Sequence, residues 1–379
     1  MRILHISADF PDPVVPAKTR AVANLLEITP EFEHMVYSLN RVRWPARVAI
    51  QEFGSGWRAM SYGALPMGLY LRTALKPVAD AILEDAARRN LRPDVVHAHK
   101  LSIDGIIGAT VAEALGLPLV LSCQGNTDLK VVRVKRDLRG LYRRLWRDSA
   151  MVFPFAPWTA EGLAALLGAR PGPMEFLPCP TPEDRIIAPT ETGPVLRSAF
   201  NLATHRVKNA DRLIRAAGRA ARKIDGLRLE IVGGGSAADM AHLTRLADAA
   251  APGVVALTGP RAHGEMQEIF NTSAGVAMPS RRESYGMVFA EALLAGAPIL
   301  HSKGFGFDGY LEDGQVSIRV AHDSGDEIMQ GLIRLARDRA AMKARLAAMQ
   351  ESGALARFQR AGIADIYRRR LREVVGRED

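Results

Sequence analysis

Short runs of apolar, mostly β-branched residues alternate along the chain with longer stretches of helical periodicity. In the first half, this pattern predicts strands at 3–7, 95–99, 119–123 and 151–155, and helices over 77–90 and 103–115. After about residue 190 the alternation resumes, with strands predicted at 227–232, 254–257, 274–278 and 298–300. Strands that alternate with helices indicate parallel sheets built from βαβ units. The sequence therefore predicts an α/β protein.

The two halves are separated by a stretch rich in proline and glycine, from residue 168 to residue 194. Proline at this density continues neither a helix nor a central strand, so we place the linker there. The predicted domains are 1–187 and 188–355, both doubly wound and Rossmann-like and facing a central cleft. The segment 326–375 is nearly all helical, and its last part, 356–379, is expected to pack back on the first domain. Ligands are expected in the cleft, at the carboxyl ends of the strands.

Composition narrows the classes of protein. The 379 residues include 50 Lys+Arg and 41 Asp+Glu, a formal net charge of +9, without zinc-finger spacing or a basic region leading into heptads. We therefore expect no nucleic acid partner. Two cysteines are too few for a disulfide framework, and no apolar run reaches the roughly 18 residues of a membrane span. The expected location is the cytoplasm.

The segment 130–147 carries eight basic residues and one acid. At helical spacing it places Val134, Leu138, Leu141 and Leu145 on one face and arginines on the opposite face. One interpretation is a solvated helix packed on the domain core. The other is attraction to an anionic membrane, which would suit an acceptor anchored in lipid at the inner face of the cell membrane.

The most informative stretch is 274–299, in which a buried strand runs through Pro279 and Ser280 into a short loop that contains Glu283. A helix then begins near Gly286, and Glu291 lies about two turns inside it. The N-terminus of a helix favours an anion such as a diphosphate. Two carboxylates at different depths can accept hydrogen bonds from two sets of hydroxyls on one elongated polar ligand.

Glu283 and Glu291 match the E-x7-E motif of the retaining nucleotide-sugar glycosyltransferases called glycosyltransferase family 4. The surroundings are similar too: a strand, Pro-Ser, Glu-Ser-Tyr-Gly, a helix and then Ala-Gly-Ala-Pro-Ile. The match is specific over 227–315 and looser in the N-terminal half. This resemblance implies the fold called GT-B, in which two Rossmann-like domains bind a nucleotide-sugar.

The resemblance also implies roles for individual residues. Glu283 is expected to contact hydroxyls of the donor sugar, Glu291 the ribose, and Lys208 the diphosphate. The family places an arginine a few residues before that lysine; here the spacing is not met, and Arg206 or His205 is the substitute. Further donor-binding candidates are Ser284, Tyr285, Gly286, Gly233, Gly234 and Gly259. In the first loop, where relatives carry Gly-Gly, Lys18 is the candidate for extra positive charge.

Two histidines end the strand predicted at 95–99, and alternation along a strand places His97 and His99 on one face. The family has a histidine that faces the donor sugar, and we assign this role to His99. The alternative is that a histidine at the end of a strand only packs in the core. This structural role is favoured for His97 more than for His99.

The mechanism implied by the family is transfer with retention of anomeric configuration. We can name no enzyme nucleophile, so the hypothesis is same-face attack in which the departing phosphate takes the proton of the acceptor. Lys208 would stabilise the charge that develops on the leaving diphosphate. The chain contains no D-x-D triplet, so we expect neither a metal nor a cofactor.

The predicted function is therefore a metal-independent, retaining hexosyltransferase that moves a sugar from a UDP- or GDP-sugar to a cell-surface glycan or lipid-linked acceptor, as in polysaccharide or lipopolysaccharide biosynthesis. The alternatives are a sugar-nucleotide epimerase, a phosphorylase-like enzyme, or a catalytically silent relative that binds nucleotide or glycan. A dinucleotide-dependent oxidoreductase is disfavoured. Gly233–Ala238 fits G-x-G-x-x-A, but no acid follows the next strand.

Overall fold

The computed structural model describes residues 1–43, 47–65 and 68–376. It divides into two compact units, Met1–Pro180 with Ile363–Asp379, and Thr181–Gly362. The division at 180/181 lies seven residues before the predicted domain boundary, and the chain returns to the first unit at 363 instead of 356. The final residues 377–379 of the predicted C-terminal helix lie outside the described part.

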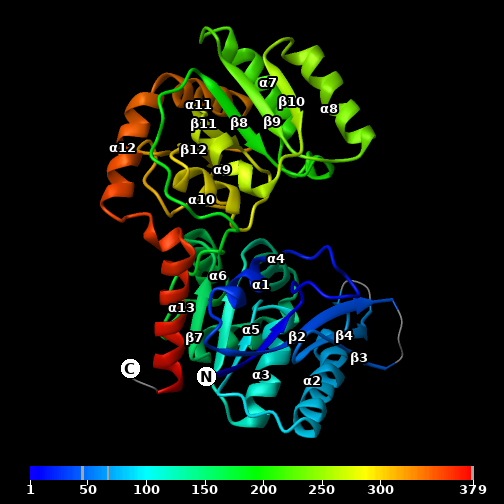
Figure 1. Ribbon diagram of the computed structural model, residues 1–379. Coiled ribbons are helices and arrows are strands. Elements are labelled where there is room, and N and C mark those ends of the chain that lie inside the picture. The colour runs from blue at the N-terminus through cyan, green and yellow to red at the C-terminus, as the bar shows by residue number, and fades with distance from the viewer. Residues whose placement is uncertain (44–46, 66–67, 377–379) are drawn as a thin grey trace. The chain divides into compact units, whose positions relative to one another are not determined.

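The first unit contains a seven-stranded sheet of order β3-β4-β2-β1-β5-β6-β7 (Figure 1). Its strands are β1 (Arg2–Ser7), β2 (Glu33–Val42), β3 (Ala49–Phe53), β4 (Trp57–Gly63), β5 (Val95–Ala98), β6 (Leu119–Cys123) and β7 (Met151–Pro154). All neighbours pair in parallel except the edge pair β3 and β4. Strand β1 lies between β2 and β5, which is the point where the strand order reverses.

Helices cover both faces of this sheet. They are α1 (Ala21–Glu27), α2 (Leu71–Arg88), α3 (Ile103–Leu115), α4 (Asn126–Val134), α5 (Arg139–Asp148), α6 (Pro157–Leu167) and α13 (Arg360–Val375). Leu4 and Ile6 of β1 point into the core formed with α2 and α3, whereas Ile3 points into the core that holds α1 and Tyr367 of α13. Burial on both faces explains why the strands β5, β6 and β7 are mostly apolar.

The second unit has a six-stranded, all-parallel sheet of order β10-β9-β8-β11-β12-β13. The strands are β8 (Val195–Ala199), β9 (Arg228–Val232), β10 (Val255–Gly259), β11 (Gly275–Met278), β12 (Ile299–Ser302) and β13 (Ser317–Val320). The helices are α7 (Ala210–Ala221), α8 (Ala237–Ala250), α9 (His263–Asn271), α10 (Met287–Leu294), α11 (Gly325–Arg337) and α12 (Arg339–Glu351). Here the order reverses between β8 and β11.

The α/β prediction is confirmed: each predicted strand coincides with an observed one to within two residues at either end. The structure adds β2, β3, β4, β8 and β13, which the apolar pattern did not reveal. In β8 the pattern is interrupted by Arg197 and Ser198. The Arg197 guanidinium is paired with Glu230 of the neighbouring β9 at 2.8 Å, and Ser198 is fully buried.

The prediction of one continuous amphipathic helix over 130–147 is wrong. The chain forms α4, a 3₁₀ turn at Arg136–Leu138 and α5. The break falls at Lys135, whose backbone leaves the helical region and whose Nζ donates to the carbonyl of Gly68 at 2.8 Å. As a result Val134 does not join Leu145 in the core; its side chain is 66% exposed.

Among the described helices, none combines the length and hydropathy that crossing a bilayer requires.

Candidate active site

The candidate residues of the second unit follow the two strands at which its sheet order reverses. Strand β8 leads into the loop that carries Lys208, and β11 leads into the loop that carries Glu283. Because both strands are parallel, both loops leave from the same edge of the sheet. Doubly wound sheets bind ligands outside the carboxyl ends of their strands at such a reversal point.

Lys208 and Glu283, 75 positions apart in the sequence, form an ion pair between Nζ and Oε2. Their side chains are 20% and 16% exposed, so both groups remain accessible from solvent. The backbone N–H of Gly306 donates to the carbonyl of Glu283 at 3.0 Å and helps to fix its loop. The structure therefore brings together two residues that the sequence analysis assigned to one donor site.

Asn209 and Arg281 hold these two loops against each other. Asn209 adopts a left-handed conformation (φ 62°) and donates from Nδ2 to the carbonyl of Pro279 at 3.0 Å. Arg281 donates from Nε to Asn209 Oδ1 at 2.9 Å and pairs with Asp211 at 2.9 Å. Asp211 and Arg281 were not among the predicted site residues, although Arg281 lies only two residues before Glu283, and this proximity was an available signal.

Glu291 lies in α10, where its side chain is buried and the residue is only 9% exposed. Burial, together with the negative charge of Glu183, raises the pKa of Glu291 to about 7. No residue in the described part of the chain forms a hydrogen bond or ion pair with its carboxyl group. A buried carboxyl group without such a partner is costly to ionise, and it gains most from a ligand that donates hydrogen bonds.

The glycine before α10 is required by the local geometry. Gly286 has φ 83°, and a Cβ at this position would lie 2.6 Å from the ring of Phe289 and 3.2 Å from Glu283 Cγ. Any other residue would therefore strain the turn that presents Glu283 next to the start of α10.

Gly233 and Gly234 follow β9, and Gly259 is the last residue of β10. A Cβ on Gly233 would lie 1.9 Å from the carbonyl oxygen of Phe200, so the backbone approach there excludes a side chain. Gly233 N donates to Gly259 O at 3.0 Å, and Leu202 N donates to Gly234 O at 2.8 Å. These contacts tie the glycine loops to the segment that leads to Lys208.

The remaining candidates of this unit differ in their surroundings. Arg206 is exposed, and no described residue forms an ion pair with it. His205 packs on His242 with ring centroids 5.0 Å apart, and burial, His242 and Arg206 lower its pKa. Ser284 is half-buried, whereas Tyr285 is buried with its ring 5.4 Å from that of Phe307. Of these four, Arg206 is the group most free to meet an anion.

In the first unit, the ammonium group of Lys18 forms its hydrogen bonds with residues of the same unit. Its Nζ donates to Asp12 Oδ2 at 2.8 Å, Ser38 Oγ at 2.9 Å and the Leu39 carbonyl at 3.1 Å. Burial disfavours the Asp12 carboxylate, but hydrogen bonds from Lys18, Ser38 and Asn40 outweigh it and lower the Asp12 pKa. All three ammonium protons are thus used, which favours a structural role for Lys18 over contact with a donor diphosphate.

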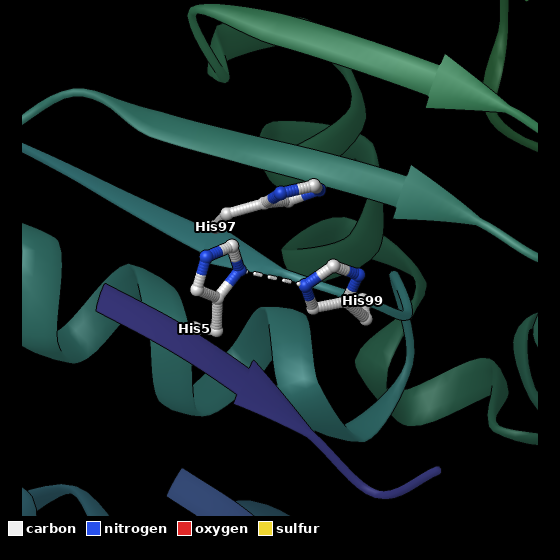
Figure 2. A group of neighbouring side chains, drawn as sticks. All are labelled: His5, His97 and His99. Carbon is white, nitrogen blue, oxygen red and sulfur yellow. Dashed lines mark hydrogen bonds between the residues drawn. The ribbon is translucent and has the colours of Figure 1, made fainter. Parts of the chain in front are cut away.

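His97 and His99 lie at the end of β5 in a buried cluster with His5 of β1 (Figure 2). His5 Nδ1 and His99 Nε2 are 3.0 Å apart, and His5 Nε2 lies 2.9 Å from His34 Nδ1. His97 contacts the hydroxyl of Tyr367 at 2.7 Å and that of Ser122 at 2.9 Å. The structural alternative for His97 is therefore the favoured one.

His5, His97 and His99 also bring ligand atoms within 4.8 Å of one another, as a metal site would. Both ring nitrogens of His5 and both of His97 are nevertheless engaged in hydrogen bonds. Coordination needs a free lone pair aimed at the ion. We therefore do not assign a metal to this cluster.

A second polar group at the same edge of this sheet was missed by the sequence analysis. Lys100, which follows His99, pairs with Asp9 at 2.6 Å. Next to it Asp104 is fully buried, and burial raises its pKa to about 7 although Lys100 opposes the shift. The position of Lys100 directly after the strand that ends with the histidines was the only sequence signal.

Comparison with known proteins agrees with this arrangement. Residues 18–180 match the family model described as glycosyl transferase 4-like domain. Residues 194–338 match the model described as glycosyl transferases group 1. Each half of the chain is therefore similar to a glycosyl transferase domain family.

Among curated proteins, the chain is 27% identical over 278 residues to a D-inositol 3-phosphate glycosyltransferase of Gordonia bronchialis, a match that covers 65% of this chain. The chain spans about three fifths, 59%, of the length of that relative.

Among solved structures, the fold is similar to sucrose-phosphate synthase of Thermosynechococcus elongatus, with a TM-score of 0.72 and 16% identity over 99% of this chain and 100% of that one. It is also similar to Anabaena Alr3699/HepE in complex with UDP, with a TM-score of 0.71 and 15% identity over 98% of this chain and 100% of that one. The fold is that of the GT-B glycosyltransferases.

Proposed function

We propose that the protein is a retaining glycosyltransferase that binds a nucleotide-sugar in its second unit. The observation that carries the proposal is the surroundings of Glu291. Its carboxyl group is buried and accepts no hydrogen bond from the described part of the chain. It lies in α10, the helix that follows the loop of Glu283, which pairs with Lys208. Ribose hydroxyls would supply the missing donors. The match of both halves to glycosyl transferase family models supports the same conclusion.

When the donor binds, Lys208 and Glu283 leave their ion pair and each contacts a different part of the donor. Lys208 turns to the diphosphate, and Glu283 accepts hydrogen bonds from hydroxyls of the sugar. As the bond between sugar and phosphate breaks, negative charge grows on the leaving diphosphate, and a fixed ammonium group stabilises that charge. The departing phosphate takes the proton of the acceptor on the same face of the sugar.

The donor is a UDP- or GDP-sugar, and the fold similarity to a protein solved with UDP favours the uridine nucleotide. The acceptor is a glycan or a lipid-linked sugar. Arg206 is the group we assign to the second phosphate contact, because it is exposed on the loop that also carries Lys208.

We further propose that the first unit docks on anionic membranes. Besides the basic residues of 130–147, four apolar side chains are exposed there or in the segment before α2: Leu65, Leu69, Tyr70 and Val134. The hydrogen bond between Lys135 and the carbonyl of Gly68 joins these two segments. Apolar side chains beside basic ones are the combination that binds an interface rich in anionic lipid.

The test is a thermal-shift panel of UDP-, GDP- and ADP-sugars, followed by transfer assays with the donor that stabilises the protein. A ligand at 100 times its Kd stabilises the native state by about 2.7 kcal/mol. Glu283→Ala should abolish turnover, whereas Glu268→Ala on the exposed side of α9 should not. Release of free nucleotide only when an acceptor is present would separate transfer from epimerase or phosphorylase chemistry. Turnover that survives Glu283→Ala would contradict the assignment, and binding without turnover would indicate a silent relative.

A further inference from the structure

Lys208 and Glu283 neutralise each other in the ligand-free protein. Their ion pair joins the loop after β8 to the loop after β11. Within the described part of the chain, neither residue forms an ion pair with any other side chain. The Glu283 carboxylate faces one further donor, the hydroxyl of Ser280, whose Oγ lies 3.5 Å from Oε2. Each charge therefore depends on the other, and a ligand that takes one partner leaves the other without its counter-charge.

The side chain of Glu283 has little room to turn away from the site. Its Cγ lies between two glycines: a Cβ on Gly306 would be 3.0 Å from this atom, and a Cβ on Gly286 would be 3.2 Å from it. The lysine, in contrast, carries its charge on a flexible stem of four carbons. When the ion pair opens, we therefore expect the ammonium group to move and the carboxylate to stay.

An intact nucleotide-sugar satisfies both members of the pair. Its diphosphate offers negative charge to Lys208, and hydroxyl groups of its sugar donate hydrogen bonds to Glu283. A carboxylate only accepts hydrogen bonds, so these hydroxyls are suitable replacements for the ammonium group. Hydrogen bonds to an ionised acceptor are roughly twice as strong as those between neutral groups. The exchange leaves neither charge without a partner.

A free nucleoside diphosphate satisfies only Lys208. It has no sugar hydroxyls beyond the terminal phosphate, so Glu283 loses the ammonium group and gains nothing. The terminal phosphate is also more negative than in the nucleotide-sugar, where the sugar esterifies it, because a phosphate monoester carries a charge of about −1.5 to −2 at pH 7. Two negative groups then lie side by side in a partly buried site, where their repulsion is stronger than in water.

We propose that Glu283 makes the site selective for the intact nucleotide-sugar over the free nucleoside diphosphate, and that the ion pair with Lys208 re-forms and displaces the diphosphate once the sugar has left. This rests on the proposed function, which supplies the ligand. Glu283 thus has a second role besides its contact with the sugar. The consequence is weak product inhibition, since each turnover removes the hydroxyls that kept the carboxylate satisfied.

The test is calorimetric titration of the full chain with UDP, GDP and ADP and with the glucose conjugate of each. In Glu283→Gln the side chain keeps its shape but loses its charge, so Lys208 is no longer paired. The free diphosphate with the preferred base should bind this variant about tenfold more tightly than the wild type, the scale of one contact to a charged group. The glucose conjugate should bind the variant no more tightly. Unchanged or weaker binding of the free diphosphate would overturn the proposal.

Three further variants complete the test. Glu268→Gln makes the same change in net charge on α9, where the side chain is 62% exposed, and should bind the free diphosphate as the wild type does. Equal tightening in Glu268→Gln would mean a general attraction of anions and would contradict the role of Glu283. Glu283→Ala is a second neutral variant and should tighten binding in the same way, which covers a folding failure of Glu283→Gln. Glu283→Asp keeps the charge and should keep the weak binding.

The titrations also separate this role from the proposed function. If the nucleotide-sugar binds but neither neutral variant of Glu283 gains affinity for the free diphosphate, only the selective role of Glu283 is refuted. If no nucleotide and no nucleotide-sugar binds the wild type or the variants, the proposed function itself fails.

Discussion

The candidate groups of the two units differ in how far their hydrogen bonds are satisfied. In the first unit, Lys18 uses all three of its protons on its own domain, and His97 uses both ring nitrogens. In the second unit, Glu291 meets no partner in the described chain, and Lys208 and Glu283 have mainly each other. A polar group whose bonds are complete stabilises the fold, whereas one that is buried and incomplete is available to a ligand.

The largest expected effect is the loss of activity when Lys208 is replaced. Lys208→Met should lower kcat about 100- to 1,000-fold, the usual cost of removing one group that stabilises transition-state charge. Lys223→Met, near the end of α7 and exposed, is the matched control and should retain wild-type turnover. Equal activity of the two variants would remove Lys208 from the site.

Lys18→Met tests the structural role of Lys18 in the first unit. Because the side chains of Lys18 and Asp12 are 10% and 0% exposed, removal of the lysine leaves a buried carboxylate without its counter-charge, although the hydrogen bonds from Ser38 and Asn40 remain. The apparent free energy of unfolding of the first unit should fall by about 3 kcal/mol. Nucleotide affinity should not change. A stable variant with weakened nucleotide binding would instead restore Lys18 to the donor site.

Glu291→Gln should stabilise the ligand-free protein in a pH-dependent way. The pKa of Glu291 is raised in the folded state to about 7, so the unfolded chain ionises first as pH rises. The wild type therefore loses stability relative to the variant from about pH 4.5 to pH 7, by about 3 kcal/mol in total. Urea unfolding at pH 5 and pH 8 measures the difference. If the stability of Glu291→Gln relative to the wild type does not increase with pH, Glu291 is not desolvated in the folded protein.

The site residues that could be predicted from the sequence are those that belong to a local pattern. Glu283, Gly286 and Glu291 lie within nine residues of one another, so a local pattern was sufficient to place them. Lys208 was found through the resemblance, and the structure adds its contact with Glu283. Lys18, Val134 and the His5–His34 pair depended on partners far along the chain, and no periodicity reports those.

The smallest effects concern the proposed membrane surface. Replacing exposed basic residues of 130–147, such as Arg136 and Arg143, with glutamine should weaken binding to anionic vesicles by roughly 1 kcal/mol per residue at low salt. Tyr70→Ser should weaken binding further, and neutral vesicles should not bind. If the wild type ignores anionic vesicles, the basic face is only a solvated surface.

The most direct test of the donor site is the proton released when nucleotide-sugar binds at pH 7. Free Glu291 is about half protonated there, and ribose hydroxyls that donate to its carboxylate would lower its pKa. Calorimetry in two buffers of different ionisation enthalpy should give about half a proton released per ligand bound, and Glu291→Gln should release none. Binding without proton release, or the same release from the variant, would contradict the account.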